Sequence, residues 1–328
     1  MFARMSRVLA VAGVVAALSA SWAGAAGAVP RPASSEVNLF ASVSASGSLL
    51  AGTPGTTVAR VARGRFEVTF STNVSGCAYV ATAVKAHAQA VMTWVASGQA
   101  SNRAVFVETR YQDNGGYSAA PFNLVVDCGQ PGWSYAVVGY SENLVRATPG
   151  TTLTPLTPGR YDVTFPTSVR DCAYLASSGD PGTGNDTSPL NGTYTGSSSD
   201  PDQVYIETKN PGGGLSPGLP FHLEVICPSA AGTHFAVVRA SGTAARHSNG
   251  TTSRTTATGE YVMATHQSLA ACAEVATRGS VNTSVPYTPT TVQIVPQSAS
   301  NTIGIEVRDL LFFGGHLDSQ SFHVAAVC

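Results

Sequence analysis

The sequence predicts an all-β protein made of three tandem antiparallel β-sandwich-like modules, each with one internal disulfide. A phrase occurs three times, as GRFEVTFSTNVSGCAY at residues 64–79, GRYDVTFPTSVRDCAY at 159–174 and GEYVMATHQSLAACAE at 259–274. Apolar and polar residues alternate inside the phrase, and each copy carries a cysteine near its end. The repetition indicates duplicated modules, the alternation indicates strands, and the cysteines indicate disulfides.

The repeated unit is longer than this phrase. Upstream, ASVSASGSLLAGTPGTT aligns with AVVGYSENLVRATPGTT and AVVRASGTAARHSNGTT. Downstream, VFVETR aligns with VYIETK and IGIEVR, and PFNLVVDC aligns with PFHLEVIC and SFHVAAVC. The alignment predicts β-modules at residues 37–128, 133–227 and 233–328, preceded by a signal peptide at 1–28 and a short N-terminal segment at 29–36.

Alternation assigns the strands within each unit. The segments FEVTF and YDVTF alternate apolar and polar side chains, the period of two that is typical of a strand with one buried face. Residues 84–98 carry a weak helical pattern, which we interpret as a loop followed by a strand. Glycine and proline clusters separate the segments, so each unit is expected to contain about six or seven short strands in a sandwich or small barrel.

The six cysteines fall two to a unit. In each unit one cysteine lies near the end of the repeated phrase and the other ends the last predicted strand. Because we expect each unit to fold on its own, we predict pairing within units: Cys77–Cys128, Cys172–Cys227 and Cys272–Cys328. In the chain-entropy model each of these long loops stabilises its unit by about 4 kcal/mol when it is closed.

The N-terminus predicts export. Arg4 and Arg7 precede an apolar run at residues 8–20, and small residues then offer cleavage sites near Ala25 or Ala28. This order of basic, apolar and small residues is typical of a secretory signal peptide, and the run is shorter than the about 20 residues needed to span a bilayer. We expect a secreted, extracellular protein; an uncleaved membrane anchor is the alternative.

Charge excludes two classes of partner. Charged residues make up 11% of the chain, the formal net charge is −1, and the only lysines are Lys85 and Lys209. Without a basic patch or a basic amphipathic helix, we expect no nucleic-acid partner and no membrane insertion.

The repeated pattern resembles a repeat common in secreted hypothetical proteins of high-GC Gram-positive bacteria. The resemblance is carried by G-x-Y-x-V-x-F, C-A-Y, V-x-V-E-T and P-F-H-x-x-V-x-C, and it covers nearly all of the chain after the signal peptide. It implies export and a β-rich fold, and it implies no established activity. The third unit departs most, with Ala264 and Thr265 in place of Thr-Phe and Glu274 in place of tyrosine.

We expect no enzymatic activity. A serine nucleophile needs a base within reach, and the sequence has no G-x-S-x-G elbow. His222 and His323 stand where the first unit has Asn123, and alternation places them on the solvated face of a strand. The acidic loop between Asp180 and Asp202 lacks the spacing of a calcium loop, so neither a metal site nor a cofactor is expected.

A glutamate followed two residues later by a cation recurs in every unit. Side chains at this spacing share one face of a strand, so we interpret them as surface ion pairs worth about 0–1 kcal/mol each. A ligand-facing role is the alternative. The pairs are Glu108 with Arg110, Glu207 with Lys209, and Glu306 with Arg308.

The units differ most at residues 83–103, 179–202 and 278–300. Variable loops on a rigid scaffold often carry function, but drift in an unconstrained loop produces the same variation, so both readings stay open. The candidate ligand-facing aromatic residues in these segments are Trp94, Tyr194 and Tyr287.

These observations favour a secreted, non-enzymatic repeat protein that binds an extracellular ligand, either a cell-wall glycan or a protein surface. A structural or coat role at the cell exterior is the alternative, and a secreted hydrolase is the third. Short linkers at residues 129–132 and 228–232 keep neighbouring modules close. We expect a loosely articulated row; closure around a pseudo-threefold axis would require a similar apolar patch on each module.

Overall fold

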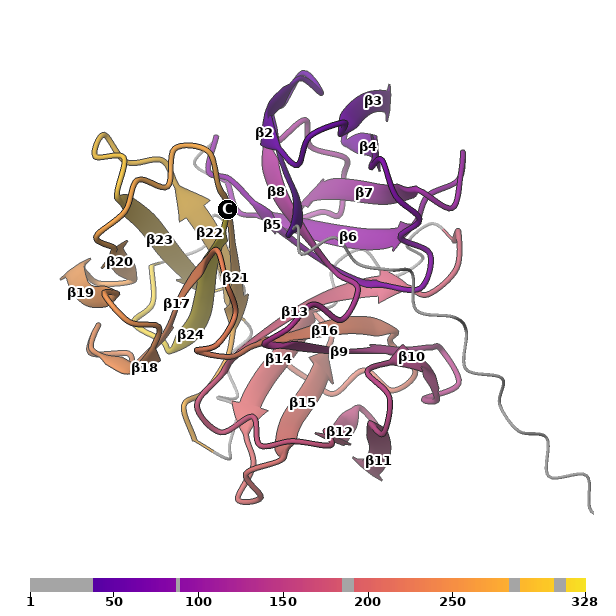
Figure 1. The fold of residues 1–328 in the computed structure, drawn as a ribbon, viewed down its shortest axis with the longest axis vertical. Coiled ribbons are helices and arrows are strands. Elements are labelled where there is room, and N and C mark those ends of the chain that lie inside the picture. The colour runs from indigo at the N-terminus through magenta and orange to yellow at the C-terminus, as the bar shows by residue number, and fades with distance from the viewer. Residues whose placement is uncertain (1–37, 87–88, 185–191, 283–289, 310–316) are drawn as a thin grey trace, which may run out of the picture. The chain divides into compact units, whose positions relative to one another are not determined.

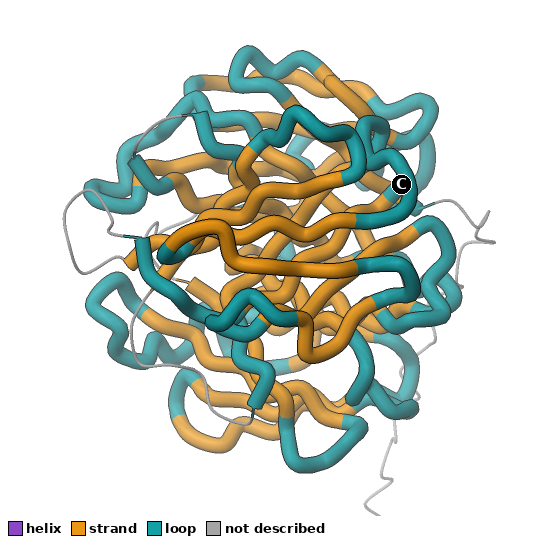
Figure 2. The backbone as a smooth tube through the Cα atoms, turned by 90° about the vertical axis from the view of Figure 1, so that its left-hand side faces the viewer, coloured by secondary structure: helices purple, strands orange, loops and turns teal. Residues whose placement is uncertain are grey.

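A computed structural model describes residues 38–86, 89–184, 192–282, 290–309 and 317–328. They belong to one compact unit, Ser34–Cys328. The regular structure in these ranges is entirely β, with 24 strands (Figure 2). The described residues contain no helix that is long and apolar enough to cross a membrane. The predicted signal peptide and the segment at 29–36 lie outside the described residues.

Module 1 has two antiparallel sets of four strands, with the orders β2-β1-β8-β5 and β3-β4-β7-β6 (Figure 1). Through the parallel contact of β6 with β13, the second set continues into module 2 as one eight-stranded sheet. The predicted loop plus strand at residues 84–98 is confirmed, because β6 occupies the second half of that segment. The strands are β1 (Leu39–Val43), β2 (Leu49–Gly52), β3 (Thr57–Ala62), β4 (Arg65–Thr69), β5 (Ala78–Ala83), β6 (Val91–Ser97), β7 (Ala104–Tyr111) and β8 (Phe122–Asp127).

Module 2 has the same order in its sheets β10-β9-β16-β13 and β11-β12-β15-β14, and module 3 in β18-β17-β24-β21 and β19-β20-β23-β22. Module 2 comprises β9 (Trp133–Val138), β10 (Leu144–Ala147), β11 (Thr152–Thr157), β12 (Arg160–Thr164), β13 (Ala173–Asp180), β14 (Gly192–Ser197), β15 (Gln203–Lys209) and β16 (Phe221–Ile226). Module 3 comprises β17 (Thr233–Val238), β18 (Ala244–His247), β19 (Thr252–Ala257), β20 (Glu260–Ala264), β21 (Ala273–Arg278), β22 (Thr290–Val295), β23 (Thr302–Asp309) and β24 (Phe322–Val327).

The predicted all-β class with three disulfide-bearing modules is confirmed. Each module has eight strands, more than the about six or seven expected from turn signals. The additional strands are short edges such as β2, β10 and β18, of 4 residues each, which alternation does not resolve.

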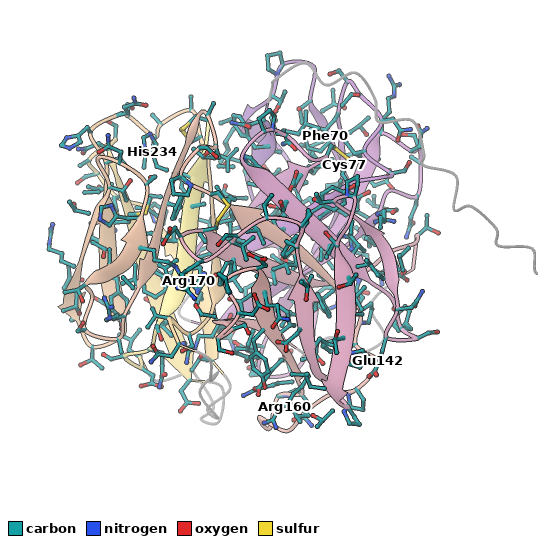
Figure 3. All side chains as sticks on the ribbon, turned by 60° about the horizontal axis from the view of Figure 1, so that its bottom comes forward. Phe70, Cys77, Glu142, Arg160, Arg170 and His234 are labelled. Atoms are coloured by element: carbon teal, nitrogen blue, oxygen red, sulfur yellow. A yellow bond between two sulfur atoms is a disulfide. The ribbon has the colours of Figure 1, made fainter. Side chains whose placement is uncertain are left out.

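The three predicted disulfides are present, and the Cys77 bridge is visible in Figure 3. In module 1 the bridge joins the turn before β5 to the end of β8, and these two strands are neighbours in one sheet. The described residues contain no free cysteine. Three disulfides indicate that the protein folds in an oxidising compartment.

The modules do not form an articulated row, and that prediction is wrong. The ends of β5, β13 and β21 each pair in parallel with a strand of a neighbouring module, so the three junctions close in a cycle. The partners are Gly179 with Val95 (modules 2 and 1), Gly279 with Thr195 (modules 3 and 2), and Val84 with Ile294 (modules 1 and 3). We call this closed arrangement the ring; its centre is where β5, β13 and β21 lie against one another (Figure 1).

An apolar cluster contributed by all three modules fills the junctions. It includes Val80 from β5, Leu175 from β13 and Val275 from β21, which occupy equivalent positions and are fully buried. The next residue along each strand, Ala81, Ala176 or Ala276, points into the core of its own module. These strands are therefore buried on both faces, as in the interior of a parallel sheet. This shared patch is what closure requires.

Three hydroxyls reinforce the junctions, one from each module. Each accepts a hydrogen bond from the backbone N–H of an alanine in the neighbouring module and donates to the carbonyl of the same alanine. We call these contacts the hydroxyl clasps. They join Thr82 to Ala276 (2.8 and 3.0 Å), Ser177 to Ala81 (3.0 and 3.2 Å) and Thr277 to Ala176 (2.8 and 3.1 Å).

Replacing Thr277 with valine is expected to lower the free energy of unfolding by about 1–3 kcal/mol, because the buried N–H and C=O of Ala176 lose their shared partner. Thr277→Ser is the matched control, since serine serves in the equivalent clasp at position 177. Urea titrations of both variants measure the difference. Equal losses in Thr277→Val and Thr277→Ser would show that the clasp contributes nothing.

Candidate functional site

A pocket opens where the three modules meet. Its lining comes from β5 and β6, β13 and β14, and β21 and β22, and its cavity volume is about 70 Å³. Besides the three clasp hydroxyls, the lining includes Thr93, Ser178, Thr193, Thr290 and Thr291. The pocket is therefore shared by all three modules and rich in hydroxyl groups.

The pseudo-threefold relation explains which positions line the pocket. The first residues of β6, β14 and β22 lie beside the last residues of β5, β13 and β21, and both sets face the centre of the ring. Hydrogen bonds fix several of the hydroxyls: Thr93 Oγ1 donates to the carbonyl of Ala81 (2.6 Å), and the Ser178 and Thr193 hydroxyls bond each other (3.0 Å). The lining is thus preorganised by its own strands.

Among the described residues that line the pocket, Arg278 alone carries a charge. The side chain is 3% exposed. Its guanidinium donates to Thr290 Oγ1, to the carbonyl of Ser321 and to Oε1 of Gln320 (2.7 Å for the last). Burial lowers the pKa of Arg278 to about 10, so the guanidinium remains protonated at neutral pH.

The predicted aromatic candidates lie in different places. Tyr194 lines the pocket, is buried, and donates its hydroxyl to the carbonyl of Thr290 (3.1 Å). Burial raises its pKa to about 12, so it remains a neutral hydrogen-bonding group. Trp94 occupies the equivalent position in module 1 but is buried outside the lining. Tyr287 lies outside the described residues.

The predicted glutamate–cation pairs exist, but they are not on the surface. Glu108, Glu207 and Glu306 are buried and do not line this pocket, so the surface interpretation is wrong. The cause is that each glutamate binds two cations rather than one, which compensates its charge when it is buried. The pairs are Glu108 with Arg110 (2.7 Å) and Arg65 (3.1 Å), Glu207 with Lys209 (2.8 Å) and Arg160 (3.0 Å), and Glu306 with Arg308 and Lys85.

Lys85 crosses a junction to reach Glu306. In modules 1 and 2 the second cation comes from the facing strand, as Arg65 or Arg160, but in module 3 that position is Glu260. Lys85 of module 1 supplies the missing positive charge. The ion pair therefore belongs both to module 3 and to the junction between modules 3 and 1.

His222 and His323 are not solvated, and that prediction is also wrong. Both are fully buried at junctions, where His222 Nδ1 accepts the backbone N–H of Tyr79 (3.1 Å) and His323 Nδ1 accepts that of Tyr174 (2.8 Å). The ring centroids of His222 and Tyr79 lie 4.9 Å apart, and those of His323 and Tyr174 lie 5.1 Å apart. Alternation correctly pointed these histidines away from the core of their own module, but the neighbouring module covers them.

The third junction uses different residues at the same positions. Asn123 replaces the histidine and Glu274 replaces the tyrosine, and the Asn123 amide donates to both the backbone carbonyl (2.9 Å) and the carboxyl of Glu274 (2.8 Å). Burial raises the pKa of Glu274 to about 7. The two departures seen in the sequence are therefore one coupled change across a contact.

A serine and a histidine do lie side by side, but they do not form a catalytic pair. Ser177 and His222 face each other across β13 and β16. The hydroxyl of Ser177 bonds the backbone of Ala81, and the imidazole bonds the backbone of Tyr79 and Asp180. Both side chains are engaged in holding a junction, which leaves the hydroxyl without a base.

Neither the motifs nor the spacing in the sequence indicated the pocket. The signal was the coincidence of small hydroxyl residues (Thr82, Ser177 and Thr277) at one aligned position beside the variable segments. Within the described ranges no group of three or more histidine, cysteine, aspartate or glutamate residues could hold a metal ion. Comparison of the chain with protein-family models, with curated proteins and with solved structures finds no match.

Proposed function

We propose that this is a secreted, non-enzymatic binding protein whose ligand site is the pocket shared by the three modules. The observation that carries the proposal is the pocket itself, a concave site with hydrogen-bonding side chains from every module. Binding sites in proteins are typically concave, with a small number of placed polar groups. A cavity of about 70 Å³ admits only a few non-hydrogen atoms, so it suits one terminal group of a small molecule or of a cell-wall glycan better than a protein surface.

The chemistry of the lining supports binding rather than catalysis. The described lining residues offer hydroxyls, one phenol and one guanidinium, but no carboxylate, imidazole or thiol to act as a general base. His222 and His323, on the strands that pair with β13 and β21, hold junctions. Export is supported by the predicted signal peptide and by the three disulfides.

Filling the pocket is expected to abolish binding without unfolding the protein. Thr291 lines the pocket where the other modules have Met92 and Gly192, so this position accommodates side chains of different size. Thr291→Trp occupies the space, and Thr291→Val keeps the volume and serves as the matched control. Isothermal titration calorimetry with small saccharides, soluble cell-wall fragments and small organic acids should show a ligand that binds the wild type and Thr291→Val but not Thr291→Trp.

The contrary result is equally clear. If a ligand binds Thr291→Trp as tightly as the wild type, then its site is elsewhere on the protein. If no compound in the panel binds the wild type, the pocket is not a site for these classes of ligand, and the proposal fails for them.

A further inference from the structure

The charge of the pocket indicates the class of ligand. We propose that the pocket binds a small oxyanion, the carboxylate, sulfate or phosphate group of a small molecule, with Arg278 as its positive anchor. The neighbouring hydroxyl of Thr290 acts as an additional hydrogen-bond donor. This inference rests on the proposed binding function and specifies its ligand.

Arg278 differs in its partners from Arg110 and Lys209, the other cations that are buried among the described residues. Arg110 and Lys209 each bind a glutamate directly. Arg278 has no carboxylate within ion-pair distance among the described residues; its Nη2 donates to Gln320, whose amide in turn donates to Asp318 (2.7 Å). A buried guanidinium without a directly bound anion is unfavourable, and a ligand oxyanion would compensate it.

The guanidinium also has donors to offer. Its five N–H groups make three hydrogen bonds to protein acceptors, so Nη1 and Nη2 each keep one further N–H. Two such donors in a planar fork match the two oxygens of a carboxylate, sulfate or phosphate group. The adjacent hydroxyl of Thr290 lies in the same lining.

The pseudo-threefold relation shows that the ring does not need a cation at this position. Ala83 and Ser178 occupy the places equivalent to Arg278, and both of their modules close the same junctions with small side chains. The arginine is therefore a departure specific to module 3. It puts a single positive charge into a pocket whose other described lining residues are uncharged.

Calorimetric titration with phosphate, sulfate, acetate and citrate, at constant ionic strength, tests the inference, with glucose as a neutral probe. At least one oxyanion should bind the wild type saturably. Its affinity should fall tenfold or more in Arg278→Gln and less in Arg278→Lys, which keeps the charge but not the fork. The same anion should fail to bind Thr291→Trp and should bind Thr291→Val normally, which separates binding in the pocket from the general effect of salts.

Two results would overturn the inference. If a neutral saccharide binds the wild type, is lost in Thr291→Trp and is unchanged in Arg278→Gln, the pocket is a binding site but not an anion site. If an oxyanion binds Arg278→Gln as well as the wild type, Arg278 is not its anchor. Should Arg278→Gln fail to fold, the loss of oxyanion binding in Thr291→Trp, together with no binding of glucose by the wild type, carries the test. If no compound of the panel binds the wild-type protein, the result counts against the proposed function itself.

Discussion

Replacing Cys172 and Cys227 together with alanine is expected to lower the free energy of unfolding by about 4 kcal/mol and to destabilise all three modules at once. The magnitude follows from opening a loop of 55 residues in the unfolded chain. The destabilisation reaches all three modules because they are joined in the ring: module 2 supplies His222 to one junction and Tyr174 to the other. Its strands also contribute Leu175 to the central cluster.

Urea unfolding measures both parts of this prediction. Tryptophan fluorescence reports on Trp94 in module 1 and Trp133 in module 2, and far-ultraviolet circular dichroism reports on all strands. The two probes should give one coincident transition, shifted to lower urea in the variant. The Cys272→Ala/Cys328→Ala variant is the matched control and should shift the same single transition. Separate transitions, with modules 1 and 3 unaffected, would mean that the modules fold independently after all.

Stability is expected to change little between about pH 6.5 and 4.5 and to fall steeply below. His222 and His323 accept backbone hydrogen bonds at Nδ1, and burial, followed by the nearby Arg146 for His222 and Arg246 for His323, holds the pKa of each well below its ordinary value of 6.5. The unfolded chain therefore binds two protons that the folded chain does not. This difference removes stability as the pH falls through 6.5.

Two buried glutamates act in the opposite sense. Burial, and then the charge of Asp127, raises the pKa of Glu224 well above its ordinary value of 4.5, and burial raises that of Glu274 to about 7. The folded chain therefore binds these protons before the unfolded chain does, and gains stability as the pH falls from about 7 to 4.5. Between pH 6.5 and 4.5 the unfolded chain binds two extra protons at the histidines and the folded chain binds two at the glutamates, so their effects on stability nearly cancel. Below 4.5 these two glutamates contribute no further gain, whereas each histidine removes up to about 1.4 kcal/mol per pH unit until the pH reaches its lowered folded-state pKa.

The double variant Glu224→Gln/Glu274→Gln removes the compensation while preserving side-chain size. It should be more stable than the wild type near pH 7 and should begin to lose stability at pH 6.5 instead of 4.5. Urea midpoints at half-unit pH steps compare the two proteins. Identical pH profiles would contradict the assignment of the opposing protons to these two glutamates.

The strands and the disulfides could be predicted because their signals are local. Alternation in FEVTF depends only on which face of one strand is buried, and the cysteine pairs depend only on two strands of one sheet. The ring could not be derived in this way. A strand with one face in its own core has the same sequence pattern whether water or another module covers its other face, so alternation alone predicts a solvated His222.

The sequence nevertheless contained evidence of closure. The segment AYVATA, which forms β5, is largely apolar on both faces, which is typical of strands buried on both sides. The paired departures Asn123 and Glu274 likewise indicated a contact between modules 1 and 3. The pocket was harder to predict, because its lining depends on the positions of three separate strand pairs and no single unit contains it.

The junction contacts are head-to-tail, since the residue that one module presents at the tyrosine position meets the histidine position of the next. An interface of this kind has two unlike faces, and a row of modules would leave one of each unsatisfied at its ends. Molecules with such ends add to one another and grow into fibres. Here Asn38, at the start of module 1, donates to the carbonyl of Cys328, the last residue of module 3 (3.3 Å). The junction of modules 3 and 1 therefore pairs the two unlike faces within one chain. Opening this junction would expose both faces, which is the arrangement from which filaments grow.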